Sequence, residues 1–199
     1  MSVRERFNEF YRGFRSTQLW IDMVNTRENS PWHREENTSV HTQMLLKWYD
    51  DNLFNYRTDE QRMLTMVGCL MHDIGKFPAQ VVKESPEKGV YRSYAGHEQL
   101  SARLWVDFAM QNPDAMKALR FDLGDIANIS FMLEYHVPWS LKDKTKRANL
   151  KKAFITRLGE DGHGAWLDML LCDQHGRIAD EQAKHLAEVD AWMIGWNAL

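Results

Sequence analysis

The sequence predicts an all-α fold, in which a single domain is built as a bundle of helices. Apolar side chains recur at three- and four-residue spacing along most of the chain, which is the period of an amphipathic helix. Residues that cap helices precede several of these segments. We find no alternation of apolar and polar residues sustained enough to predict a sheet, no repeats and no low-complexity linker. The 199 residues, 44% of them hydrophobic, are enough to enclose one core.

In the N-terminal half, aromatic residues at helical spacing and capping residues define the predicted elements. Thr38 or Ser39 can cap one helix, and the sequence Thr58-Asp-Glu-Gln61 is a capping box that opens another. Gly75 is expected to stop that second helix. The predicted elements are helices over about 3–15, around 20–23, over 38–54 and over 58–73, with a polar loop over 25–37.

In the C-terminal half, prolines separate the predicted helices. Pro113 breaks one helix and Pro138 ends another. The stretch 77–94 holds two prolines and Gly89, so we expect a long loop with at most one turn of helix. The first predicted helix of this half begins near 96 and runs past 108, and the second covers 122–135. A further helix begins near 148, and the last two cover 161–177 and 178–196.

Charge and cysteine content restrict the class of protein. A net charge of −3 argues against a general affinity for nucleic acid or anionic membranes. The basic run 142–152 is interpreted either as a solvated face or as a surface for a polyanionic substrate. Cys69 and Cys172 form no disulfide framework, and neither a signal peptide nor a membrane-spanning apolar run is evident. We therefore expect a cytoplasmic protein with no membrane partner, and the oligomeric state stays open.

The stretch Cys69-Leu-Met-His-Asp-Ile-Gly-Lys76 carries the strongest chemical signal. Its adjacent His72 and Asp73 close an apolar helix, where two polar groups are costly unless something pairs with them. A metal ion is the simplest partner, because imidazole and carboxylate are both metal ligands.

Matching ligand types recur at intervals of tens of residues. His41, His97 and His136 stand at helix ends or at inward-facing positions, and Asp173 interrupts the otherwise apolar Leu-Leu-Cys-Asp. This spacing fits one ligand group on each helix of a bundle, with all groups directed at one cavity.

These blocks resemble the HD superfamily of metal-dependent phosphohydrolases. The nearest resemblance is to the HD domain of bacterial CCA-adding tRNA nucleotidyltransferases and its stand-alone relatives; the nucleotidyltransferase part is not matched, so only phosphohydrolase activity is implied. The resemblance implies one HD-type domain over 1–199, with a core of about 31–180, helices over 1–30 before it and a C-terminal helix over 178–199. The matching stretches are Trp32-His-Arg-Glu-Glu-Asn-Thr-Ser-Val-His-Thr42, Leu70-Met-His-Asp-Ile-Gly-Lys76, Gly96-His-Glu98, Glu134-Tyr-His136 and Leu170-Leu-Cys-Asp-Gln-His-Gly-Arg177.

The resemblance also implies a ligand set for one or two divalent ions per chain. Asp73 would bridge the two ions and position a shared water as the nucleophile. The identity of the ions stays open among Mn, Ni, Co, Mg, Fe and Zn, because histidine and aspartate suit many of them. The first ion would be bound by His41, His72, Asp73 and Asp173, and the second by Asp73, His97 and His136.

Substrate-binding residues are expected beside the ions. Lys76, one helical turn past His72, would neutralise charge developing on a phosphoryl group. Arg92 and Arg177 are further candidates for this role. His33 and Arg34 precede the first ligand and are expected to contact the substrate.

The expected function is hydrolysis of a phosphomonoester or a 2′,3′-cyclic phosphodiester of a nucleotide or of a nucleic-acid end. An alternative is a one-metal deoxynucleoside 5′-phosphate or triphosphate hydrolase, because Arg34-Glu-Glu-Asn-Thr-Ser-Val-His41 also resembles that branch. Against it, Gly75-Lys76 stands where that branch carries a glutamate. A third candidate is an HD-type di-iron oxygenase with the same six ligands, and a fourth is a sensor that binds a nucleotide without cleaving it. Substrate specificity is expected from the segments 25–37 and 77–95 and from the stretch after His136.

Overall fold

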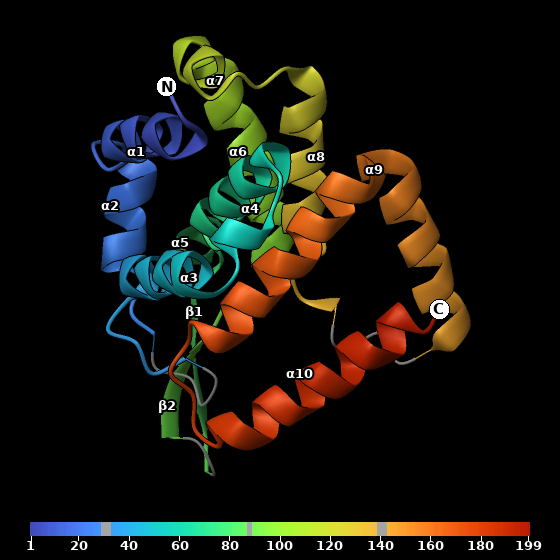
Figure 1. Ribbon diagram of the computed structural model, residues 1–199. Helices are drawn as coiled ribbons and strands as arrows, with labels where there is room; N and C mark the ends of the chain where they lie inside the picture. The colour runs from blue at the N-terminus through green and yellow to red at the C-terminus, as the bar shows by residue number, and fades with distance from the viewer. Residues whose placement is uncertain (29–32, 87–88, 139–142) are drawn as a thin grey trace.

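The computed structural model describes residues 1–28, 33–86, 89–138 and 143–199, and within these ranges most residues are helical (Figure 1). This confirms the predicted helical bundle. In chain order the elements are α1 (Val3–Phe14), α2 (Gln18–Asn25), α3 (Thr38–Asn52), the short 3₁₀ helix η1 (Phe54–Tyr56), α4 (Asp59–Met71), α5 (Lys76–Ala79), β1 (Val81–Ser85), β2 (Gly89–Ser93), α6 (His97–Gln111), α7 (Pro113–Leu119), α8 (Leu123–Glu134), α9 (Lys144–His175) and α10 (Gln182–Asn197). None of the helices within the described ranges is long and apolar enough to cross a membrane.

Helix α4 lies at the centre of the bundle and packs against α1, α3, α8 and, most extensively, α9 (Figure 1). The predicted capping box is present, with Thr58 and Gln61 each accepting from the other's backbone N–H. Every residue from 63 to 71 is buried. The C-terminal end of this helix therefore lies in the core, and His72 and Asp73 follow it directly.

Two glycines allow the segments that carry His97 and Asp173 to approach their neighbours closely. A Cβ atom at Gly75 would lie 2.4 Å from the carbonyl oxygen of His97, and a Cβ atom at Gly176 would lie 2.9 Å from the backbone nitrogen of Leu45. At Gly75 the start of α6 packs closely against the turn after α4. At Gly176 the end of α9 packs closely against α3. Gly75 has a φ of −79°, which any residue adopts, so its role is close packing rather than the expected helix stop.

The segment 77–94 corrects the prediction of a long loop without strands. After α5 the chain forms an antiparallel hairpin, in which Val81 of β1 pairs with Ser93 of β2 and Ser85 pairs with Gly89. The valines favour a strand, yet Val81 and Val82 are exposed. Because no face of β1 is buried, the sequence carries no apolar-polar alternation that could have revealed the hairpin.

Several helix boundaries also differ from those predicted. Asn37, rather than Thr38 or Ser39, caps α3, and Pro113 opens α7, because proline suits the first position of a helix. Helix α9 begins at Lys144 and is kinked at Gly159, whose φ is 68°. Helix α10 begins at Gln182 instead of near 178.

The C-terminal helix closes over α9 through aromatic packing. Trp192 and Trp196 of α10 contact Trp166 of α9. The indole N–H of Trp196 donates to Nε2 of His163 at 3.1 Å. His163 is buried in this aromatic cluster, where burial lowers its pKa. In the basic run, Lys142 lies outside the described residues, Lys144, Lys146 and Lys152 are exposed, and Lys151 donates to the Trp196 carbonyl.

Candidate metal centre

The six side chains predicted as metal ligands meet at one place in the core. They come from five segments of the chain, and all are buried except His97, whose side chain is 12% exposed. His41 belongs to α3, His72 and Asp73 follow α4, His97 begins α6, His136 follows α8, and Asp173 lies in the last turn of α9.

Four ligand atoms form a closed ring. His41 Nε2 lies 3.1 Å from Asp173 Oδ1, which lies 3.8 Å from His72 Nε2. His72 Nε2 lies 3.0 Å from Asp73 Oδ2, which lies 3.7 Å from His41 Nε2. Atoms that share one ion at about 2.0–2.3 Å are separated by distances of this size. The ring could therefore hold a metal ion at its centre.

A second group of ligand atoms adjoins the ring through Asp73. The other oxygen of this carboxylate, Oδ1, lies 3.1 Å from His97 Nε2 and 3.7 Å from His136 Nε2. The two Nε2 atoms are 3.1 Å apart. Asp73 therefore directs Oδ2 to the first group and Oδ1 to the second, as a carboxylate that bridges two ions would do.

Each ligand histidine is oriented by a hydrogen bond from its Nδ1, which turns Nε2 towards the site. For three of them the acceptor is the main-chain carbonyl three residues earlier. These bonds run from His72 to Cys69 at 2.9 Å, from His97 to Tyr94 at 2.8 Å and from His136 to Leu133 at 2.6 Å. His41 instead donates to Oε1 of Glu35 at 3.1 Å.

The second oxygen of Asp173 is held away from the ring. Its Oδ2 accepts from Gln174 Nε2 at 2.7 Å and from Arg177 Nη2 at 2.8 Å. The Nε2 of His185, on α10, donates in turn to Gln174 Oε1 at 2.6 Å. Oδ1 of Asp173 is thereby left to the ring.

The charges and hydrogen bonds of the site fit a cation. Among the described residues, His72 Nε2 is a buried atom without a hydrogen-bond partner, which is rare in protein cores, and Asp73 Oδ2 is buried with the Lys76 ammonium as its ion-pair partner. Burial works to raise the pKa of Asp73, but the charges of His72 and Lys76 hold it well below its usual range. For Asp173, Arg177 and His41 outweigh burial and lower the pKa in the same way. Both carboxylates are therefore ionised and available as ligands.

Lys76 lies inside the site rather than at its rim. Its Nζ is 2.8 Å from Asp73 Oδ2 and 2.8 Å from Oε1 of Glu28, and the lysine is 3% exposed. Burial disfavours the ammonium, but the two carboxylates outweigh it and raise the pKa of Lys76. Glu28 also accepts from the hydroxyl of Thr38 at 2.9 Å.

Glu28 and Glu35 are the functional residues that sequence reasoning missed. Both are buried, whereas Glu36, in the same polar stretch, is exposed. The only available signal was the position of Glu35, six residues before His41 in a segment that resembled a family motif.

A cavity of about 480 Å³ opens on the candidate metal centre. Four of the five predicted substrate-binding residues line it, namely His33, Lys76, Arg92 and Arg177. The rest of its lining includes Tyr91 and Tyr94 from the hairpin and its end, Val137, His185 and five of the six ligand residues.

Arg34 is the exception, because the structure does not bring it to this cavity. Its guanidinium forms two hydrogen bonds with the carboxylate of Asp180, in the segment before α10, and its side chain is 44% exposed. Arg34 joins two segments of the chain through this pair, and its contact with a substrate stays a prediction.

Metal binding should release about one proton from His41 near pH 7.5. Burial works to lower the pKa of this imidazole, but hydrogen bonds to Asp173 and Glu35 outweigh it and raise the pKa to about 9. A cation must displace the proton on Nε2. Calorimetric titration with Co²⁺ in buffers of different ionisation enthalpy measures this release, and Glu35→Gln should reduce it. Heats that do not depend on the buffer would contradict this account of His41.

The chain matches no protein-family model, no curated protein and no solved structure. The geometry of these side chains is therefore the basis for inferring a function.

Proposed function

We propose that this protein is a metal-dependent phosphohydrolase of the HD superfamily. Its proposed substrate is a phosphomonoester or a 2′,3′-cyclic phosphodiester of a nucleotide or of a nucleic-acid end. The observation that carries the proposal is the carboxylate of Asp73, which places one oxygen in each of two adjoining ligand groups. Two divalent cations bound there would polarise a phosphoryl oxygen and lower the pKa of a water.

The residues around the cavity support a phosphorylated substrate. Lys76, Arg92 and Arg177 bring positive charge to its wall, and guanidinium groups recognise phosphate oxygens well. Arg177 also holds Asp173, so it orients a ligand as well as facing the cavity. Tyr91 and Tyr94 supply aromatic surface on which a base can stack.

The second ligand group favours two ions over the one-metal alternative. His97 and His136 are not needed to hold a single ion in the ring, yet both are fixed by hydrogen bonds and face Oδ1 of Asp73. A loaded protein with one ion per chain would instead favour the deoxynucleotide hydrolase.

A hydrolysis screen tests the proposal. Protein loaded with Mn²⁺, Ni²⁺, Co²⁺, Mg²⁺, Fe²⁺ or Zn²⁺ is incubated with 5′- and 3′-monophosphates, 2′,3′-cyclic phosphates and deoxynucleoside triphosphates, with Asp73→Ala as the blank. We expect product with at least one metal and one of the first three substrate types, and none after chelation. No turnover in protein shown by elemental analysis to hold metal would contradict the proposal. Substrate-dependent O₂ consumption by the iron form would favour an oxygenase.

A further inference from the structure

We propose that His33 is an additional ligand of the first ion, beyond His41, His72, Asp73 and Asp173. This inference rests on the proposed metal centre and concerns how that centre is completed. It replaces the role in substrate binding that the sequence suggested for His33.

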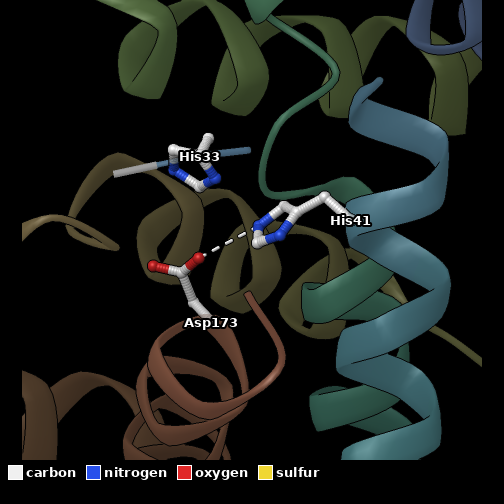
Figure 2. A group of neighbouring side chains, drawn as sticks. All are labelled: His33, His41 and Asp173. Carbon is white, nitrogen blue, oxygen red and sulfur yellow. Dashed lines mark hydrogen bonds and ion pairs between the residues drawn. The ribbon is translucent and has the colours of Figure 1, made fainter. Parts of the chain in front are cut away.

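The position of the imidazole carries the inference. A ring nitrogen of His33, a ring nitrogen of His41 and a carboxylate oxygen of Asp173 all lie within 4.8 Å of one another. Figure 2 shows the three side chains converging from three separate segments of the chain. The rings of His33 and His41 meet edge to face, with centroids 4.7 Å apart. His33 lines the cavity whereas His41 does not, so His33 stands on the cavity side of the ring of ligand atoms.

The backbone holds His33 in this position. The next residue, Arg34, donates its N–H to the carbonyl of Ile178 at 2.8 Å, and its side chain pairs with Asp180. The N–H of Ile178 donates to Oε1 of Glu35 at 2.8 Å. These contacts hold the segment before α3 against the segment between α9 and α10. They thereby fix the backbone from which the His33 side chain projects.

Glu35 faces both imidazoles and forms a hydrogen bond with one of them, His41. Its Oε1 accepts from Nδ1 of His41, and its Oε2 lies 3.5 Å from Nδ1 of His33. A carboxylate behind a metal-bound imidazole is the usual way in which proteins orient such a ligand. Here one carboxylate would serve two ligands, which explains why Glu35 is buried although it lies in a polar segment.

A separate third ion is chemically disfavoured at this place. It would have to share His41, yet Nε2 of His41 already faces the ring and its Nδ1 is bonded to Glu35. An imidazole nitrogen has one lone pair and cannot bind two ions through it. His33 therefore joins the ion of the ring.

Three imidazoles and two carboxylates around one ion have a consequence for metal choice. Imidazole suits Zn, Fe, Co and Ni better than Mg. With His33 bound, the first site should prefer those ions over Mg²⁺, and this preference should weaken when His33 is replaced.

Co²⁺ binding to His33→Ala and His33→Phe tests the inference. Phenylalanine keeps a ring against His41 but has no lone pair. Both variants should bind Co²⁺ at least about 10-fold more weakly than the wild type in competition with a chromogenic chelator, because losing a ligand should cost no less than losing a residue that orients one. Both should also change the visible absorption of the bound ion, which reports the number of its ligands. His175→Ala, whose imidazole stacks on Trp48 instead, is the control and should leave both readouts unchanged.

The outcomes separate this inference from the proposed function. Unchanged affinity and spectrum in His33→Phe would overturn the role of His33 while leaving the hydrolase proposal standing. If the wild type binds Co²⁺ but cleaves no nucleotide, the hydrolase proposal fails, and the affinities of the variants still decide the role of His33. A wild type that binds no Co²⁺ would overturn both.

Discussion

Replacing Asp73 with asparagine should abolish binding at both of the proposed metal sites. The two carboxylate oxygens of Asp73 face different ligand groups, so one substitution weakens both groups at once. Changes to residues that merely orient a ligand cost about 10–100-fold in metal affinity, so the loss of a shared charged ligand should exceed about 100-fold at each site. Elemental analysis after dialysis against a weak chelator measures the loss.

His97→Ala is the informative comparison for this prediction. His97 contacts His136 and, within the ring, Oδ1 of Asp73 alone, so its removal should abolish binding at the second site and leave the first site intact. Asp51→Asn changes an exposed carboxylate of α3 that pairs with Lys47 and should leave both ions in place. Loss of only one ion in Asp73→Asn would show that Asp73 does not bridge.

Replacing Lys76 with methionine should strongly destabilise the metal-free protein. The lysine is buried and is the cation beside both Glu28 and Asp73. Removing one partner of a buried ion pair typically costs about 3–5 kcal/mol, because the remaining charge stays in the core without compensation. Urea unfolding in the presence of a chelator measures this change in the free energy of unfolding.

The double variant Lys76→Met with Glu28→Gln separates charge from packing. Glutamine can still accept from Thr38, so neutralising Glu28 should recover much of the stability lost in the single variant. Lys47→Met, which removes an exposed lysine paired with Asp51, should change stability little. A small effect of Lys76→Met, similar to that of Lys47→Met, would contradict the proposed charge balance of the core.

Three of the candidate ligands stand out in the sequence because they occupy positions where polar groups are rare. His72, Asp73 and Asp173 interrupt apolar helical segments, where an unpartnered polar group is costly. The same rule reveals nothing in a polar segment, so the buried Glu28 and Glu35 could not be told apart from the exposed Glu36.

Long-range contacts account for the remaining differences between sequence and structure. Arg34 pairs with Asp180, which is far away along the chain, and no local sequence pattern predicts that pair. The role of Gly75 likewise depends on the carbonyl of His97, which reaches it only when the start of α6 packs against the turn before α5. The hairpin was missed because β1 buries neither of its faces.

A crystal structure of Mn²⁺-loaded protein, with anomalous diffraction, shows whether Asp73 bridges two ions. We expect two peaks about 3.5–4 Å apart, as in two-metal phosphohydrolase sites. One should lie within the ring of His41, His72, Asp73 and Asp173, and the other between Asp73, His97 and His136. Metal-loaded crystals with no peak in contact with Asp73 would contradict the account.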